Sequence, residues 1–162
     1  MGGYIKPKGT KILCHRLYNG DSVFKEDSTQ IRESFKLCEL VCSCCNTVIL
    51  KHEQLDLIQA VRNFMKRGIR VNSHYRCGNY NKRVGGYQYS KHMSGTATDL
   101  GIDPNSLSKE ELNNLINHAV EHGAKEIGLY YSKRFIHFAT ESTSTRFNKK
   151  HKGIKYRLFI KR

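Results

Sequence analysis

The stretch Ser90–Asp99, S-K-H-M-S-G-T-A-T-D, decides how the rest of the chain is interpreted. It places His92 and Asp99 seven residues apart, a spacing that does not fit one helical face and needs a turn. Gly95 can supply that turn, because glycine adopts positive φ without a steric penalty. Residues 96–102 then predict a buried strand that presents Asp99 from a rigid element. Imidazole and carboxylate are ligands that zinc accepts in catalytic sites.

A catalytic zinc usually has three protein ligands and an open position, so a third ligand is needed. The best candidate is His137 in the predicted strand R-F-I-H-F-A-T. Phe135 and His137 share one face of that strand, whereas Ile136 and Phe138 share the other. The chain has eight histidines, and most His–Asp pairs at such a spacing are structural. Ligand chemistry alone therefore leaves a metal site and a structural pair both open.

The pattern S-x-H-x-x-G-x-A-x-D resembles the signature of zinc-dependent peptidases of the M15 type. These are D-Ala-D-Ala carboxypeptidases and related phage endolysins, which cut D-amino-acid-containing peptides of bacterial cell walls. Three further segments are similar to the family in order and spacing: Phe35–Leu40, Val71–Gly86 and Ile127–Phe138. The resemblance implies an M15 peptidase fold in which His92, Asp99 and His137 bind Zn²⁺.

The resemblance also implies roles for two residues near the metal. Arg76 lies where the family has an arginine that binds a substrate carboxylate, and its planar fork suits a bidentate pair with a terminal D-Ala. Ser90 matches the first residue of the motif, a hydrogen-bond partner near the metal. The alternatives are a solvated surface arginine and a serine that caps a loop. Four tyrosines are further candidates for lining a cleft or packing in strands: Tyr87, Tyr89, Tyr130 and Tyr131.

The sequence departs from the family where the general base is expected. Relatives carry an acid three residues before the third ligand or two residues after it, and these positions are Arg134 and Ala139 here. Glu141 is a candidate base if the strand of His137 continues that far, and Glu126 lies nearby in sequence. Three interpretations stay open: a base elsewhere in the chain, a naturally inactive relative that binds wall peptides, or an engineered substitution at Ala139.

Two amphipathic helices are predicted. The first covers Leu50–Arg67, with its apolar residues on one stripe and Gly68 at its end. The second begins at a capping box formed by Ser108 and Glu111 and stops at Gly123. Both helices have an apolar face that must pack on a core.

Four strands are predicted at residues 69–73, 126–131, 134–140 and 154–160, in addition to the strand that carries Asp99. Residues 28–36 are expected to form a turn or loop. Residues 11–24 predict a hairpin, with Asn19-Gly20 as the turn. We therefore expect a single α+β domain with a small, mostly antiparallel sheet and two main helices. Residues 1–34 would form an N-terminal hairpin or extension packed on a zinc peptidase domain at 35–162.

The length of 162 residues suits one domain with a sizeable core. The formal charge of +14 predicts a polyanionic partner. Anionic peptidoglycan is the expected partner, and nucleic acid is the alternative that rests on charge alone. No apolar run is long enough to span a membrane. The first residues lack the apolar segment of a signal peptide, so we expect a protein that is made in the cytoplasm. It would reach the wall by phage-mediated release or as a virion component. We also expect it to be a monomer.

Six cysteines occur at positions 14, 38, 42, 44, 45 and 77. Reduced thiols are the expectation for a chain without a signal peptide. Cys38, Cys42, Cys44 and Cys45 form a cluster that could bind a second metal, but it lacks the C-x-x-C spacing of structural zinc sites. Free thiols in a loop are the preferred interpretation.

The leading functional hypothesis is a zinc-dependent carboxypeptidase or endopeptidase that cuts stem peptides of peptidoglycan, in phage or prophage lysis or in wall remodelling. The alternative is a catalytically silent module that keeps the zinc fold and binds wall peptides. A basic nucleic-acid-binding protein is a third hypothesis, which predicts DNA affinity that depends steeply on salt and survives the loss of zinc.

Overall fold

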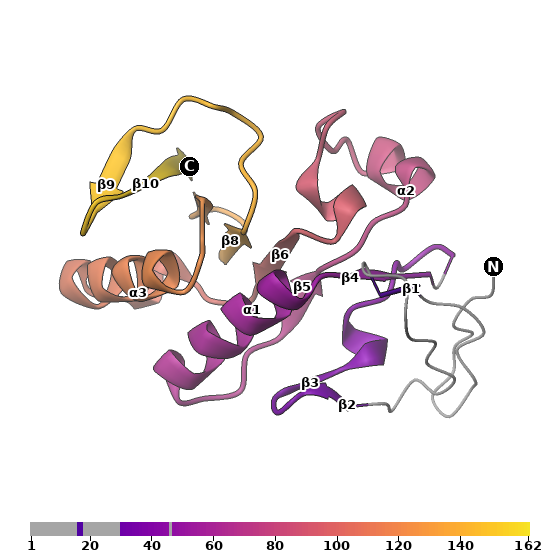
Figure 1. Ribbon diagram of the computed structural model, residues 1–162, viewed down its shortest axis with the longest axis horizontal. Coiled ribbons are helices and arrows are strands. Elements are labelled where there is room, and N and C mark those ends of the chain that lie inside the picture. Colours follow the sequence, from indigo (N-terminus) through magenta and orange to yellow (C-terminus); the bar gives the residue numbers. More distant parts are fainter. Residues whose placement is uncertain (1–15, 18–29, 46) are drawn as a thin grey trace.

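The computed structural model describes residues 16–17, 30–45 and 47–162 (Figure 1). A six-stranded sheet in the order β5-β6-β8-β7-β10-β9 runs through it. Its strands are β5 (Val71–Ser73), β6 (Ala97–Leu100), β7 (Glu126–Tyr130), β8 (Phe135–Ala139), β9 (Lys149–His151) and β10 (Ile154–Lys161). All neighbouring pairs are antiparallel except β10 and β7, which are parallel. The predicted α+β arrangement with a mostly antiparallel sheet is confirmed.

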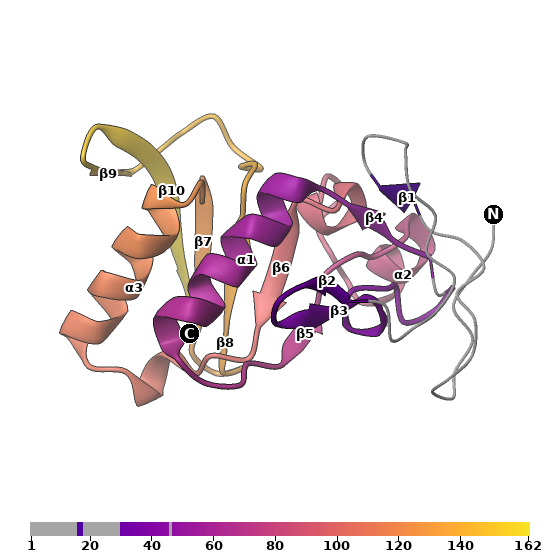
Figure 2. The ribbon, with the colours of Figure 1, turned by 60° about the horizontal axis from the view of Figure 1, so that its bottom comes forward.

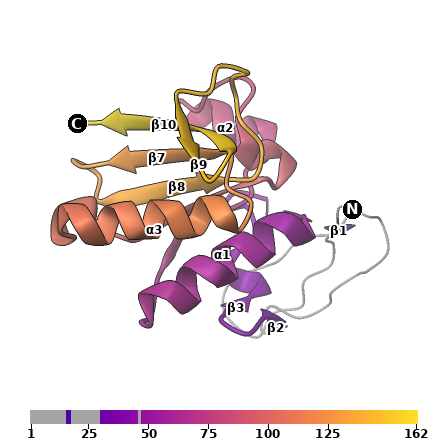
Figure 3. The same ribbon diagram turned by 60° about the vertical axis from the view of Figure 1, so that its left-hand side comes forward.

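The two main helices cover one face of this sheet. Helices α1 (His52–Met65) and α3 (Lys109–Glu121) contact each other and lie on the same side of the strands (Figures 2 and 3). Their apolar residues are buried in the core: Leu55, Leu57, Ile58 and Val61 from α1, and Leu115, Ile116, Ala119 and Val120 from α3. Both helices therefore bury the faces that the apolar periodicity predicts.

The ends of the helices follow local signals. The capping box of Ser108 and Glu111 is present at the start of α3. Helix α1 is shorter than predicted, because Ile49–Leu50 forms strand β4 and Lys66 takes the left-handed conformation at φ 52°. A left-handed residue after the last turn is a common way to end a helix.

Successive side chains of strand β6 point to opposite faces of the sheet, one of which the helices cover. Thr98 accepts a hydrogen bond from Gln54 of α1 at 3.0 Å, so its side chain faces the helices. Because side chains alternate along a strand, Asp99 points to the opposite face. Helix α2 (Gly78–Arg83) lies away from α1 and α3 (Figure 1).

Residues 28–36 were expected to form a turn or loop, and residues 28–29 lie outside the described part of the chain. The prediction holds for the turn at 33–34 and is wrong for the two short strands on either side of it. Gln30–Arg32 (β2) and Phe35–Lys36 (β3) pair as a small antiparallel hairpin. Ile31 and Phe35 are buried in the core, and β2 contacts α1. Strands of three and two residues are too short to give a periodic signal in the sequence.

The predicted hairpin at residues 11–24 lies outside the described residues, except for Arg16–Leu17. These two residues form strand β1, which pairs in parallel with β4. Helix α2 and strand β9 were not predicted, because both are short and neither has an apolar periodicity.

Candidate metal centre and cleft

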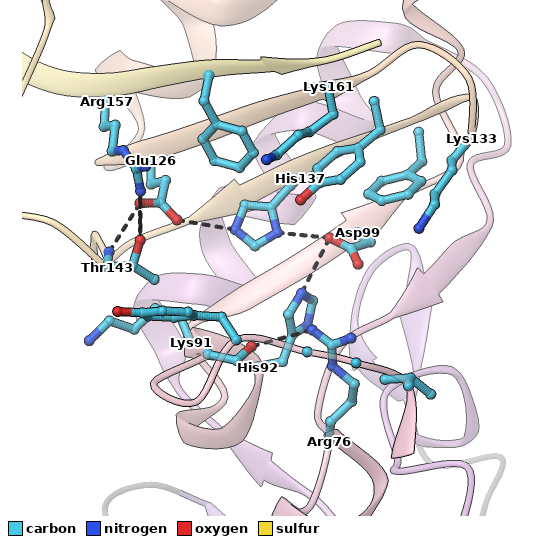
Figure 4. A pocket seen from close by; sticks show the side chains of 18 of the residues that line it. Arg76, Lys91, His92, Asp99, Glu126, Lys133, His137, Thr143, Arg157 and Lys161 are labelled. Atoms are coloured by element: carbon cyan, nitrogen blue, oxygen red, sulfur yellow. Dashed lines mark hydrogen bonds and ion pairs between the residues drawn. The ribbon is translucent and has the colours of Figure 1, made fainter. Parts of the chain in front are cut away.

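Three buried side chains converge on one point (Figure 4). His92 comes from the 3₁₀ segment η2 (Lys91–Ser94), Asp99 from β6 and His137 from β8. Oδ1 of Asp99 lies 2.8 Å from Nδ1 of His137 and 3.3 Å from Nε2 of His92. One ligand atom from each of the three residues lies within 4.8 Å of the others. His92, Asp99 and His137 are only 2%, 9% and 8% exposed, respectively.

The sheet and one turn produce this convergence. Asp99 and His137 are direct partners in the antiparallel register of β6 and β8, so their side chains share one face. Gly95 has φ 71° and follows η2, which folds His92 back toward Asp99. A Cβ atom on Gly95 would overlap the backbone carbonyl of Ile49. The turn predicted from the motif is therefore present, and only glycine fits there.

Each histidine directs one ring nitrogen toward the centre, which can bind a metal once that nitrogen is without a proton. Nδ1 of His92 lies 2.7 Å from the backbone carbonyl of His74, which can only accept, so this nitrogen carries the proton. Nε2 of His137 faces Oε1 of Glu126 at 3.6 Å, a carboxylate that favours a proton on that nitrogen. Nε2 of His92, Nδ1 of His137 and Oδ1 of Asp99 thus remain as three inward donors. This donor set fits a zinc ion.

The charges in the centre are strongly coupled. Burial would raise the pKa of Asp99, but His92 and His137 hold it well below its usual range. Burial lowers the pKa of His92 despite the attraction of Asp99. Burial alone would also lower the pKa of His137, but its contacts with Asp99 and Glu126 outweigh this effect and raise it to about 9. A proton and a cation therefore compete for Nδ1 of His137.

From the sequence, Glu126 was expected only to lie near the strand of His137. It is buried at the start of β7 and pairs directly with Ala139 of β8. Its Oε2 accepts from Ser142 Oγ at 3.0 Å, Thr143 N at 3.0 Å, Thr143 Oγ1 at 2.9 Å and Arg157 Nη1 at 2.9 Å. Burial would raise the pKa of Glu126, but the contacts with these donors and His137 lower it to about 2.

The signal that would have found Glu126 is strand register. The two predicted strands at 126–131 and 134–140 are joined by a short turn, and they pair in the order Gly128↔His137 and Glu126↔Ala139. Position 139 has alanine in place of the expected acid, but its direct partner on β7 is an acid, Glu126. Gly128 has a packing reason of its own, because a Cβ atom there would overlap the ring of Phe159.

Glu141, the candidate base from the sequence, lies elsewhere. Strand β8 ends at Ala139, so the continuation that would put Glu141 beside His137 does not occur. Its carboxylate binds Lys51 Nζ at 3.1 Å and Lys91 Nζ at 3.2 Å. It is not among the residues that line the cavity at the centre.

The three inward donors form part of the wall of a cavity of about 750 Å³. Arg76 and Ser90 also line it, and Nη2 of Arg76 donates to Oγ of Ser90 at 3.3 Å. Within the described part of the chain, the buried Nε of Arg76 has no hydrogen-bond partner. Tyr87 and Tyr130 line the cavity, whereas Tyr89 and Tyr131 do not.

The cavity is strongly basic. Its lining residues include five cationic side chains: Arg76, Lys91, Lys133, Arg157 and Lys161 (Figure 4). The lining carboxylates in the described ranges are Asp99 and Glu126. Both carboxylates have lowered pKa values and are held by hydrogen bonds or histidines. An anionic molecule is therefore the ligand that this charge distribution favours.

The buried His–Asp–His centre beside a basic cavity has the donor set of a metal site. The family model described as Peptidase M15 matches residues 30–139, more than half of the chain. The chain therefore belongs to the peptidase M15 family, and the resemblance seen in the sequence is confirmed. The match includes Arg76, the three inward donors and Glu126.

A search of curated proteins found no match to the chain. In the ranges that the structure describes, no helix is both long and apolar enough to cross a bilayer. The roles of individual residues therefore rest on the geometry given above.

Proposed function

We propose that the chain is a zinc-dependent peptidase that cleaves D-amino-acid-containing stem peptides of bacterial peptidoglycan. The observation that carries the proposal is the convergence of His92 Nε2, Asp99 Oδ1 and His137 Nδ1 at the wall of a basic cavity. Two imidazoles and one carboxylate form a common ligand set of catalytic zinc. When bound, zinc supplies Lewis acidity that polarises a carbonyl group and lowers the pKa of water.

Arg76 would orient the substrate. Its guanidinium lines the cavity and is held from one side by Ser90, and its Nε has no partner among the described residues. A carboxylate in the cavity could pair with the part of the guanidinium that lines it, in the two-bonded geometry that arginine favours. The carboxylates of stem peptides, including a terminal D-Ala, have this chemistry. Both carboxypeptidase and endopeptidase action are compatible with such binding.

Glu126 would position His137. Its Oε2 is held by Ser142, Thr143 and Arg157, which leaves Oε1 directed at Nε2 of His137. A carboxylate at this position fixes the tautomer of a metal-binding imidazole and strengthens its donor nitrogen. Glu126 thus supplies, from the neighbouring strand, the negative charge that Ala139 lacks.

A catalytically silent wall-binding module is the second candidate function, and it is favoured by Arg134 and Ala139 at the expected acid positions and by the occupied oxygens of Glu126. A general base works best when its pKa lies near the working pH. The pKa of Glu126 is lowered to about 2, and Asp99 is occupied as a ligand in this proposal. A chain with this site could hold zinc and bind stem peptides through Arg76 without turning them over.

The test is mass spectrometry of purified peptidoglycan after digestion with the zinc-loaded protein. We expect new fragments that disappear with a chelator and with His92→Ala, and their masses identify the bond that is cut. Fully zinc-loaded protein that yields no fragment but sediments with the wall would replace the peptidase with the silent module. In that case Ala139→Asp is the variant to assay for recovered cleavage.

The biological setting of the proposal is phage or prophage lysis or wall remodelling by a monomer that acts on the anionic wall. The resemblance to endolysins and the basic cavity support it. Wall binding that weakens as salt is raised is expected. DNA binding that survives in His92→Ala, without any wall binding, would instead support a nucleic-acid-binding protein.

A further inference from the structure

Four cysteines gather away from the cavity. The Sγ atoms of Cys42, Cys44, Cys45 and Cys77 all lie within 4.8 Å of one another. Sγ of Cys44 lies 3.8 Å from Sγ of Cys42 and 3.3 Å from Sγ of Cys77. A tetrahedral zinc with Zn–S bonds of about 2.3 Å needs sulfurs roughly 3.8 Å apart. The four thiols therefore already have nearly the spacing that one zinc ion requires.

The backbone around the cluster also suits thiolate ligands. The amide of Cys77 donates to Sγ of Cys42 at 3.4 Å, and the amide of Tyr80 donates to Sγ of Cys77 at 3.4 Å. Sγ of Cys45 lies 2.9 Å from Oγ1 of Thr47. The amide donors to Cys42 and Cys77 stabilise the charged form of these two thiols, which is the form that binds a metal.

We propose that Cys42, Cys44, Cys45 and Cys77 bind a structural zinc ion, separate from the centre formed by the two histidines and Asp99. Four thiolates complete the tetrahedral shell and leave no open position, which is the pattern of structural zinc. None of the four cysteines is among the residues that line the basic cavity. The inference does not rest on the proposed peptidase activity.

The sequence pointed to a different set of residues. It grouped Cys38 with the three cysteines of the loop, and C-x-C-C lacks the usual zinc spacing. In the structure, the fourth member of the cluster is Cys77 instead of Cys38. Cys77 lies far along the chain, at the start of α2. Cys77 directly follows Arg76, so the zinc would tie the loop at 42–45 to the segment that carries this arginine.

The first experiment uses the 162-residue chain purified under reducing conditions, with His92→Ala and His137→Ala combined to remove the other centre. We expect one zinc per chain by elemental analysis, with a sulfur shell at about 2.3 Å in zinc X-ray absorption. Adding Cys44→Ser should remove or loosen this zinc, whereas adding Cys38→Ser, as the matched control, should leave it bound. Equal loss in both variants would overturn the assignment.

A second measurement covers the case in which a cysteine variant fails to fold. Cobalt replaces zinc in the otherwise unchanged chain, and thiolate-to-cobalt charge-transfer absorption is expected. Absence of sulfur coordination in either experiment would overturn the proposal. A mass lower by two hydrogens, with a disulfide mapped between Cys44 and Cys77, would also overturn it. Iron–thiolate absorption of the purified chain would rule out zinc as the metal.

Discussion

The two clusters of potential metal ligands are built in opposite ways. His92, Asp99 and His137 are mixed nitrogen and oxygen donors, and two of them are fixed by the ladder between β6 and β8. They line a large cavity. The cysteine cluster has only sulfur donors, comes from a loop and the start of α2, and lies outside that cavity. The first arrangement suits chemistry on a bound molecule, and the second suits holding the backbone together.

The two clusters also have different hydrogen-bond partners around them. Both histidines of the first cluster have outward nitrogens directed at fixed acceptors, the carbonyl of His74 and the carboxylate of Glu126. The cysteines have backbone amides as neighbours instead. Changes near the first cluster should therefore alter metal affinity and catalysis, whereas changes in the second should alter stability.

The largest effect is expected for Asp99→Asn. The substitution removes the anion that both histidines face, so zinc should leave this centre and peptidoglycan cleavage should fall by roughly a thousandfold, beyond the 10- to 100-fold typical of residues behind the ligands. The sulfur-bound zinc should remain. Metal content and X-ray absorption measured on the same sample check both halves. Loss of sulfur-bound zinc in this variant would contradict this difference between the clusters.

Cys77→Ser is expected to act on stability. Loss of a structural metal should lower the free energy of unfolding by about 3 kcal/mol, which corresponds to roughly 10 °C in melting temperature for a domain of this size. Zinc affinity at the histidine centre should change little. Thermal unfolding and metal titration of the variant, with Cys38→Ser beside it, check the expectation. An unchanged melting temperature would contradict it.

The pH dependence of metal binding should be steep at one centre. The pKa of His137 is raised to about 9, so its nitrogen must lose a proton to bind zinc below that pH. Zinc affinity should rise about tenfold per pH unit from pH 7 toward pH 9, roughly 100-fold in all, and then level off. The lowered pKa values of His92 and Asp99 add no slope in this range. Competition titrations with a chelator at several pH values measure the slope.

The same shift sets the stability of the metal-free protein. A histidine with a raised pKa in the folded state stabilises fully below its unfolded value of about 6.5, and this contribution is lost as the pH rises through 9. Chelator-treated protein should therefore unfold at a lower denaturant concentration at pH 9 than at pH 6.5. Asp99→Asn should flatten this part of the profile, because it removes a main partner of His137. A profile that stays as steep in that variant would contradict the assignment.

Local signals explain what could be predicted from the sequence. Gly95 marked the turn between His92 and Asp99, and the capping box at Ser108 marked the start of α3. Apolar periodicity indicated both long helices and the strand of His137. In each case the residues that determine the structure lie within a few positions of one another, so one stretch of sequence contains the whole signal.

The features that the sequence did not place correctly depend on contacts between distant segments. Glu126 reaches the site only through the register of β7 against β8. Cys77 joins the cysteines of the loop from the far side of α1 in the sequence. Glu141 does not line the cavity, contrary to expectation, because β8 stops at Ala139. Periodicity and motif spacing do not report where a strand ends or which strand lies beside it.

Glu126→Ala and Glu126→Gln divide the role of this carboxylate. Alanine removes the acceptor that faces His137, so zinc affinity at the histidine centre should fall 10- to 100-fold. Glutamine keeps an acceptor without the charge, so a smaller loss is expected, together with a lower pKa of His137. Zinc titration and the pH profile separate these effects. Equal and complete loss of cleavage in both variants at full zinc occupancy would indicate a general base instead of a positioning residue.

The smallest effect is expected for Glu141→Gln, which is also the matched control for Glu126. Glu141 pairs with Lys51 and Lys91 and has a side chain that is 44% exposed. The Lys51 and Lys91 side chains are only 11% and 26% exposed, but glutamine keeps an oxygen that can accept from both, so stability should fall by only about 1 kcal/mol. Zinc affinity and the rate of peptidoglycan cleavage should also stay near those of the unchanged chain, because the residue does not line the cavity. A large loss of cleavage with normal zinc content would restore Glu141 as the candidate base, and would mean that the β8 end moves when substrate binds.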